Sequence, residues 1–231
     1  MKYENLKMIN KNTYLRSHTK LTDNIIHKKR LEIISIIKDE LDKKCLIDIL
    51  DIGTTKDNSQ SSNLIIKNLN NFQKYKSISD QKIKSNFFSK SLQKSITQEF
   101  SSNEIEEFSS DVVISNATIE HVGSYLEQLK MIENIIKLTK KIFIIVTPNR
   151  MHPIEFHSKI PFLHWLPKKL HREVLSIFGL KYLSREENLN LLKSSDLINM
   201  MKNFENVKYD IRYLRFLLFK SNLILIGKKL N

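Results

Sequence analysis

The chain has 231 residues, 41% of them hydrophobic, and a formal net charge of +13. This length predicts a single domain with appendages, and the apolar fraction allows a sizeable buried core. No apolar run approaches the roughly 20 residues of a membrane-spanning helix, and no apolar block follows the first lysines as it would in a signal peptide. The single cysteine, Cys45, excludes a disulfide framework. We therefore expect a cytoplasmic protein.

The surplus of positive charge has two interpretations. It can indicate an anionic partner, or it can reflect a composition rich in lysine throughout the chain. The lysines are scattered in pairs, several of them at predicted helix ends, where the helix dipole favours cations. No long basic block is interleaved with aromatic residues. Solvated surface charge is the interpretation we favour, an acidic or phosphorylated small substrate is the next, and a nucleic-acid partner is not excluded.

The first two thirds of the chain alternate between helical spacing and short apolar runs. Residues 1–20 are polar and irregular, which predicts an N-terminal arm. The segments that follow predict, in chain order, a helix at 25–44, a strand at 46–51 closed by a tight turn, a polar loop at 58–62, a helix at 64–69, a strand at 75–79, a weak helix at 83–92, and strands at 94–100 and 111–115. A helix at 124–138 and a strand at 142–146 complete this part.

All four prolines lie within one stretch of about twenty residues, which must be a loop or a set of short helices. After this stretch the pattern predicts helices at 170–178 and 186–201 and strands at 207–214 and 223–228. The connection between the last two strands is short, so one of them should be antiparallel to its neighbour. Strands that alternate with helices and are apolar on both faces predict an α/β fold with a mainly parallel sheet.

Three motifs follow predicted strands. They are Asp51-Ile52-Gly53, residues 111–116 with the string Ala117-Thr118-Ile119-Glu120-His121-Val122 after them, and Thr147-Pro148-Asn149-Arg150. These motifs resemble the first motif, the fourth-strand motif and the end of the fifth strand of class I S-adenosylmethionine-dependent methyltransferases, most closely the type 11 group of small-molecule enzymes. The resemblance implies a Rossmann-like, doubly wound, mostly parallel seven-stranded sheet with an antiparallel final strand and helices on both faces. It also implies S-adenosyl-L-methionine as the cofactor.

The resemblance assigns the methyl donor to the carboxyl ends of the strands, where open α/β sheets bind ligands. Gly53 lets the backbone approach the ligand without a Cβ, and a carboxylate after the second strand can accept both ribose hydroxyls. The residues assigned to the cofactor are Asp51, Gly53, Thr54, Asp80, Glu99, Phe100, Asn116 and Ala117. Turn-forming or capping roles are the alternatives for the polar members of this set.

One position departs from the family. The second glycine of the first motif is replaced, because Thr55 follows Gly53-Thr54. The threonine hydroxyl could hydrogen-bond the donor's carboxylate, or the side chain could crowd the site.

His121 and His157 are the candidates for acid-base catalysis, because an imidazole titrates near neutral pH. The resemblance places the acceptor pocket after the fifth strand, so the whole chain, 1–231, should be one methyltransferase domain in which 148–205 is an inserted acceptor-side or lid segment. Candidate acceptor-binding residues are Asn149, Arg150, Glu155, His157, His164 and Trp165, and we expect the wall of this pocket to continue into 187–192. The histidine spacing matches no helical zinc motif, so we expect no metal.

The predicted function is methyl transfer to oxygen or nitrogen of a small molecule such as a sugar or a lipid or quinone precursor, by a monomer or homodimer. Three alternatives stay open. The net charge of +13 also suits an RNA or protein methyltransferase, and Thr55 also suits a donor-binding protein without turnover. A Rossmann dehydrogenase would require the Gly-x-Gly-x-x-Gly motif, which the sequence lacks.

Overall fold

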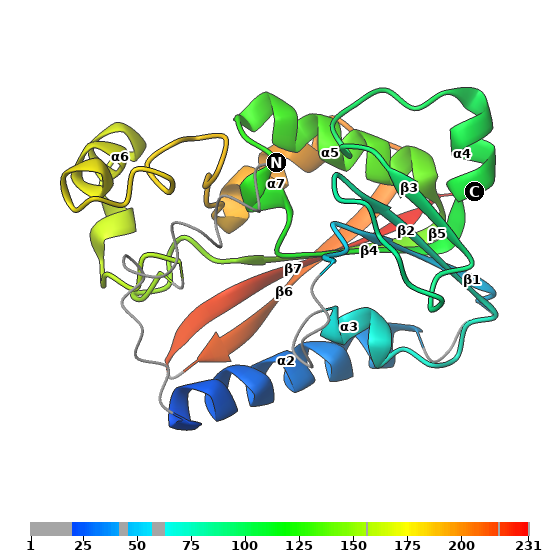
Figure 1. Cartoon of the computed structure of the whole chain (residues 1–231), viewed down its shortest axis with the longest axis horizontal. Helices are drawn as coiled ribbons and strands as arrows, with labels where there is room; N and C mark the ends of the chain where they lie inside the picture. The colour runs from blue at the N-terminus through cyan, green and yellow to red at the C-terminus, as the bar shows by residue number, and fades with distance from the viewer. Residues whose placement is uncertain (1–19, 42–45, 57–62, 156, 217, 231) are drawn as a thin grey trace.

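The computed structural model describes residues 20–41, 46–56, 63–155, 157–216 and 218–230. Most of the N-terminal arm and the polar loop at 58–62 expected from the sequence lie outside these residues. Seven strands form one sheet in the order β3-β2-β1-β4-β5-β7-β6 (Figure 1). They are β1 (Asp48–Ile52), β2 (Lys74–Ser79), β3 (Lys90–Gln93), β4 (Ser110–Asn116), β5 (Thr139–Pro148), β6 (Val207–Phe216) and β7 (Phe219–Lys229).

The pairing confirms the predicted fold class. Strands β1 to β5 run parallel to one another, whereas β7 pairs antiparallel with both β5 and β6. The chain order therefore reverses between β1 and β4, so the loops after these strands diverge and leave room for a ligand between them.

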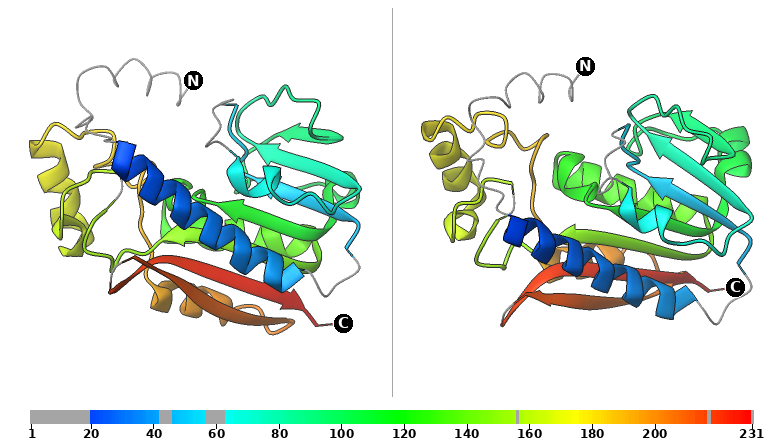
Figure 2. Two further views of the ribbon diagram at one scale, coloured as in Figure 1. Left: turned by 90° about the horizontal axis from the view of Figure 1, so that it is seen from below. Right: turned by 60° about the horizontal axis from the view of Figure 1, so that its bottom comes forward.

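Helices cover both faces of the sheet (Figure 2). The helices of the described residues are α2 (Lys20–Leu41), α3 (Leu64–Lys67), α4 (Ser102–Phe108), α5 (Tyr125–Leu138), α6 (Lys168–Ile177) and α7 (Ser194–Met201), with short 3-10 helices η1 (Ile119–His121) and η2 (Leu163–Trp165). Helix α6 lies beside η2, away from the sheet (Figure 1). None of the helices in the described ranges is long and apolar enough to cross a membrane.

Successive residues of the central strands pack into hydrophobic cores on opposite faces of the sheet, because strand side chains alternate between the two faces. Leu50 and Val113 pack with α5 and α7 in one cluster, whereas Ile49 and Val112 pack with α2 and α3 in the other. Every residue of β1 is buried, as expected for a central parallel strand that is covered on both faces, and the strand includes the two aspartates Asp48 and Asp51.

Two of the expected elements are wrong. No helix forms at 83–92, and the strand lies at Lys90–Gln93 rather than at 94–100. The segment after β3 is instead fixed by the side chain of Asn134 on α5, whose amide donates to the backbone oxygens of Ile96 and Gln98 at 2.7 and 2.9 Å. These carbonyls are therefore satisfied without a neighbouring strand.

Helix α4 was not expected, although its signal is in the sequence. Ser101 accepts a hydrogen bond from the Glu104 backbone N–H, and the Glu104 carboxylate accepts one from the Ser101 N–H. This is the Ser-x-x-Glu capping box of a helix start. The helix expected at 186–201 is reduced to its last part, α7.

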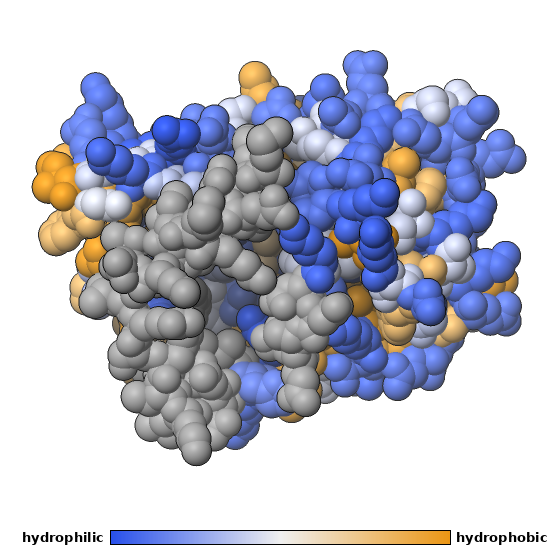
Figure 3. Space-filling view, in the orientation of Figure 1, coloured by the Kyte–Doolittle hydropathy of each residue, from blue (hydrophilic) through white to orange (hydrophobic). Residues whose placement is uncertain are grey.

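Segment 148–205 contains η2, α6 and α7. Leu175, Leu183, Leu189 and Leu191 form a small core of their own within it. Apolar side chains of α6 and the residue after it, Ile177 and Phe178, are 81% and 65% exposed. In Figure 3 apolar atoms gather at the edge where Figure 1 places α6, on a face that is otherwise mostly hydrophilic where it is coloured.

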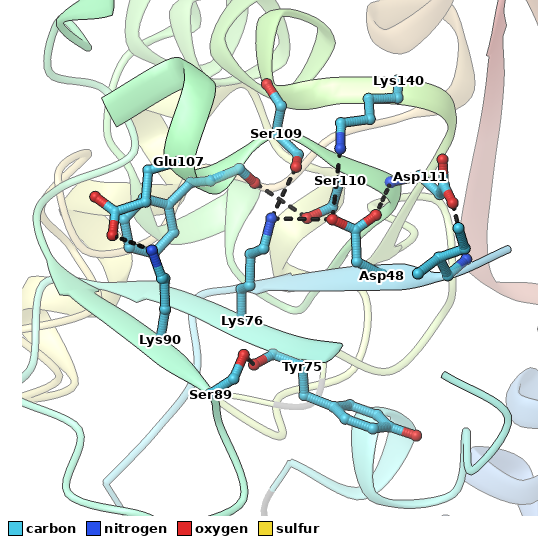
Figure 4. A network of polar contacts seen from close by, with 12 residues as sticks. Asp48, Tyr75, Lys76, Ser89, Lys90, Glu107, Ser109, Ser110, Asp111 and Lys140 are labelled. Atoms are coloured by element: carbon cyan, nitrogen blue, oxygen red, sulfur yellow. Dashed lines mark hydrogen bonds and ion pairs between the residues drawn. The ribbon is translucent and has the colours of Figure 1, made fainter. Parts of the chain in front are cut away.

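A buried ionic network joins the amino ends of three strands (Figure 4). Asp48 on β1 accepts hydrogen bonds from the Asp111 backbone N–H of β4 at 2.8 Å and from Lys76 Nζ of β2 at 3.0 Å. Lys76 also donates to the Ser109 carbonyl. Burial alone would raise the pKa of Asp48, but the bond from Asp111 and the charge of Lys76 lower it. The network fixes the relative positions of β1, β2 and β4 at their amino ends, away from the carboxyl ends of the strands.

We expect the Asp48→Asn substitution to destabilise the protein by on the order of 3 kcal/mol, because it leaves the Lys76 ammonium buried without its counter-charge. The measurement is urea unfolding. The matched control is Glu107→Gln, which removes the exposed ion pair with Lys90 and should cost less than about 1 kcal/mol. Equal unfolding midpoints for the two variants would show that the network does not hold the strands together.

Candidate functional site

A cavity of about 760 Å³ lies beyond the carboxyl ends of β1, β2, β3 and β4. Of the residues predicted from the sequence, it is lined by Asp51, Gly53, Asp80, Asn116, Ala117 and His121. These residues come from three strand ends that are far apart in the chain, and the sheet order brings them together. The cavity therefore occupies the place where open α/β sheets bind ligands.

Gly53 fixes the turn after β1. Its φ is +86°, and its backbone N–H donates to the Ile78 carbonyl at 2.9 Å. A Cβ on this residue would lie 2.1 Å from Thr118 Oγ1. The position therefore requires glycine for two reasons, the left-handed backbone conformation and the close approach of the loop after β4.

Asp51 and Thr54 form a buried pair beside this turn. The Thr54 hydroxyl donates to Asp51 Oδ2 at 2.6 Å. Burial raises the pKa of Asp51 to about 6, against the weaker opposing effect of the Thr54 hydrogen bond. Thr54 itself does not line the cavity, so the structure places it behind Asp51 rather than against a ligand.

Thr55, the residue that replaces the second motif glycine, lines the cavity and is exposed. Its backbone is held by Asn63, which accepts from the Thr55 N–H at 3.0 Å and donates to the Thr55 carbonyl at 2.9 Å. An exposed side chain at this rim leaves the interior of the cavity open.

Asp80 lies at the tip of the loop after β2, exposed and in the cavity lining. The residue before it fixes this loop, because Ser79 Oγ donates to the Thr54 carbonyl at 2.7 Å and accepts from the Gln81 N–H. The same loop therefore also contacts the turn after β1.

The residues after β3 that line the cavity are 94–97, not those predicted. Glu99 is exposed outside the lining, and Phe100 packs partly against the core, with Lys94 Nζ 4.8 Å from its ring centre. This displacement follows from the position of β3, which ends at Gln93.

The loop after β4 turns sharply into η1. Ala117 has a φ of +52°, which costs on the order of 1 kcal/mol for a residue with a Cβ, and its N–H donates to the Val146 carbonyl of β5 at 2.8 Å. The turn places His121 in the cavity lining and buries Glu120 completely. The Thr147 hydroxyl donates to Glu120 Oε2 at 2.9 Å.

His121 and His157 meet although they are 36 residues apart. Their Nε2 atoms lie 3.2 Å apart. His121 Nδ1 contacts the Asn188 carbonyl at 2.6 Å, and His157 Nδ1 contacts Glu155 Oε1 at 2.5 Å. The two candidate catalytic histidines thus form one cluster at the edge of the cavity.

The pKa values of the two imidazoles are shifted in opposite directions. Burial lowers the pKa of His121. Burial would also lower the pKa of His157, but the hydrogen bond and charge of Glu155 outweigh it and raise that pKa. Burial alone would favour neutral Glu155, yet the bonds from His157 and Ser158 lower its pKa to about 2.

None of the six residues predicted to bind the acceptor, His157 and Glu155 included, lines the cavity itself. Asn149 donates to the Lys220 carbonyl, and Arg150 donates to the carbonyls of His164 and Leu166. His164 is buried with its Nε2 2.6 Å from the His152 carbonyl, whereas Trp165 packs against Phe162 at the surface. These contacts give the four residues roles in holding segment 148–205 together.

Several lining residues escaped sequence reasoning. They are Arg30 on α2, Lys94 after β3 and Tyr182 in segment 148–205. Glu187 and Asn188, which the sequence analysis placed in the acceptor wall, also line the cavity. No motif marks Arg30, since it lies on an amphipathic helix face like many surface cations. Lys94 would have been predicted to line the site if the third strand had been expected four residues earlier, so that Lys94 followed its carboxyl end.

No protein family model matches the chain, and no curated protein sequence matches it. Solved structures are similar at low identity. N-methyltransferase NodS from Bradyrhizobium japonicum, in complex with S-adenosyl-L-homocysteine, is 8% identical with a TM-score of 0.56, over 99% of this chain and 98% of that chain. Magnesium protoporphyrin IX methyltransferase (ChlM) from Synechocystis, with the same compound bound, is 12% identical with a TM-score of 0.55, over 99% and 94%.

The small RNA methyltransferase HEN1 is 12% identical with a TM-score of 0.58, over 87% of this chain and 25% of that chain. The likeness therefore extends to methyltransferases with very different acceptors. At these identities it shows a shared architecture, and the chain has the Rossmann-like fold of S-adenosylmethionine-dependent methyltransferases.

Proposed function

We propose that the protein transfers a methyl group from S-adenosyl-L-methionine to oxygen or nitrogen of a small-molecule acceptor. The observation that carries this proposal is the cavity at the ends of β1, β2 and β4, which gathers Asp51, Gly53, Asp80 and Asn116 on its wall. The similar structures NodS and ChlM hold the demethylated donor. That the acceptor is a small molecule, as in the type 11 group, is part of this proposal.

The donor would extend along the strand ends. The exposed carboxylate of Asp80 is suited to the two ribose hydroxyls, and the segment 94–97 beside it to the adenine ring. The left-handed turn at Gly53 allows close approach of the methionine part, and Asp51 beneath it would face the donor's ammonium group. Asn116 and Ala117 would flank the sulfonium.

Methyl transfer is an in-line displacement, so the protein mainly aligns the acceptor with the methyl group and the sulfur. A bond forms between the acceptor atom and the methyl carbon as the carbon–sulfur bond breaks, and its electron pair stays on sulfur. The acceptor hydroxyl or amine loses one proton. The cluster of His121, His157 and Glu155 is the group at the cavity edge suited to promote that loss.

Segment 148–205 supplies the acceptor side of the site in this proposal. Tyr182, Glu187 and Asn188 reach the cavity from it. A hydroxyl, a carboxylate and an amide suit a polar acceptor such as a sugar, and the exposed apolar residues of α6 suit a lipid or quinone precursor. Closure of this segment over the donor would exclude water during transfer.

Calorimetric titration with S-adenosylmethionine and S-adenosylhomocysteine tests the donor site. We expect micromolar binding that weakens at least about tenfold in Asp80→Ala, because two hydrogen bonds to a carboxylate are lost. Glu99→Ala is the matched control, since Glu99 lies outside the lining, and it should bind as the wild type does. If the folded protein binds neither compound, the methyltransferase proposal fails.

Donor binding should also depend on pH through Asp51. Its carboxyl has a pKa of about 6 when the cavity is empty, and the donor's ammonium favours the ionised form, so binding below that pH must release a proton. The affinity should therefore rise about tenfold between pH 5 and pH 7 and level off above. Asp51→Asn should bind more weakly at pH 7 and lose the slope. A slope that persists in this variant would exclude Asp51 as its source.

A further inference from the structure

The strongest unexplained feature of the site is the carboxylate of Glu120. Its side chain is completely buried, and Oε1 has no hydrogen-bond donor among the described residues, although Oε2 accepts from the Thr147 hydroxyl. An unsatisfied buried carboxylate oxygen is costly. His121 Nε2 lies 3.9 Å from this oxygen, too far for a hydrogen bond.

The hydrogen bonds of the two histidines determine where their lone pairs point. His121 Nδ1 faces the carbonyl of Asn188, and His157 Nδ1 faces the carboxylate of Glu155. Both oxygens can only accept, so each Nδ1 carries the proton. In the neutral rings the two unprotonated Nε2 atoms then lie 3.2 Å apart, a repulsive contact unless a cation lies between them.

A proton shared by the two Nε2 atoms would relieve the repulsion between the rings. It would leave Glu120 Oε1 unsatisfied, because a proton on the line between the nitrogens makes no bond to the carboxylate. A metal ion coordinated by all three atoms satisfies both rings and the carboxylate together. Glu120, His121 and His157 offer ligand atoms that all lie within 4.8 Å of one another.

The spacing of the two histidine nitrogens suits a tetrahedral ion, whereas Glu120 Oε1, which lies 3.9 Å from His121 Nε2, would have to move closer to coordinate it. Metal–nitrogen bonds of about 2.05 Å at tetrahedral angles place two ligand nitrogens about 3.3 Å apart, close to the 3.2 Å between His121 and His157. Two imidazoles and one carboxylate favour a transition metal such as Zn²⁺ over Mg²⁺, which prefers oxygen ligands. Such three-ligand sites keep a fourth position open for water or substrate.

Each ligand also has the outer hydrogen bond that metal sites use to orient their ligands. Glu155 binds the far nitrogen of His157, the Asn188 carbonyl binds that of His121, and Thr147 binds the second oxygen of Glu120. The side chains of His121 and His157 are 25% and 23% exposed, so an ion can enter from the cavity.

We propose that Glu120, His121 and His157 bind one divalent transition-metal ion, of the Zn²⁺ class, at the acceptor end of the cavity. The sequence did not predict this site, because its ligands lie on the 3-10 helix η1 and on the segment after β5, without the spacing of a helical zinc motif. His152, also a ligand type, lies outside the group of described residues whose ligand atoms are within 4.8 Å of one another.

The consequence for catalysis rests on the proposed function. An acceptor hydroxyl in the open coordination position would have a lowered pKa, which is how bound metals generate nucleophiles at neutral pH. It would lose its proton to solvent and attack the methyl carbon as an alkoxide. The ion would thus perform the deprotonation assigned above to the cluster as a whole.

The test uses tag-free full-length protein, stripped with a chelator and titrated with Zn²⁺ by calorimetry and with Co²⁺ by visible absorption. We expect one ion per chain and the intense absorption of tetrahedral Co²⁺. His121→Ala and His157→Ala should weaken binding at least about a hundredfold, and Glu155→Gln, which removes only an outer hydrogen bond, about tenfold. His27→Ala, an exposed histidine on α2, is the matched control and should leave binding unchanged.

Circular dichroism establishes that each variant is folded, and Glu120→Gln, which keeps the shape of the side chain, provides a second ligand variant. Binding that is absent in the wild type, or that survives in both histidine variants, overturns the metal site. The titrations need no donor, so Co²⁺ absorption without S-adenosylmethionine binding would retain the metal site and remove the methyltransferase proposal. Donor binding without Co²⁺ absorption would do the reverse.

Discussion

The candidate site depends on one close contact, that of Gly53 against Thr118. The turn after β1 and the loop after β4 approach until a single Cβ would overlap the threonine hydroxyl. The contact requires a left-handed residue without a side chain at the end of β1. It also sets the separation between Asp51 near the end of β1 and Asn116 at the end of β4, and both residues line the cavity.

A short series of turns after this contact positions the other residues of the site. Ala117 takes a left-handed conformation while its N–H continues the ladder to β5, and η1 begins directly after it. The short helix buries Glu120 and directs His121 into the cavity. His157 then reaches His121 because its own ring is held by Glu155. The buried network around Asp48 supports the same strands from their other ends.

The sequence was informative where one residue type is the only solution to a local constraint. Asp51-Ile52-Gly53 and the string from Asn116 to His121 predicted both the strand ends and the side of the sheet that carries the cavity. It failed where tertiary contacts override local pattern. The segment after β3 has the composition of a strand, but its carbonyls bond to Asn134, 36 residues or more along the chain. The pairing of His157 with His121 has no local signal either, since it depends on how segment 148–205 folds back.

The most direct test of the account is a crystal structure of the protein soaked or grown with S-adenosylhomocysteine. The account predicts the nucleoside in the cavity, with the ribose hydroxyls on Asp80, the ammonium group over Asp51 and the sulfur beside Asn116 and Ala117, facing His121. A nucleoside bound elsewhere on the chain, or a cavity that stays without it at saturating concentration, would contradict the central claim that this cavity is a methyl-donor site.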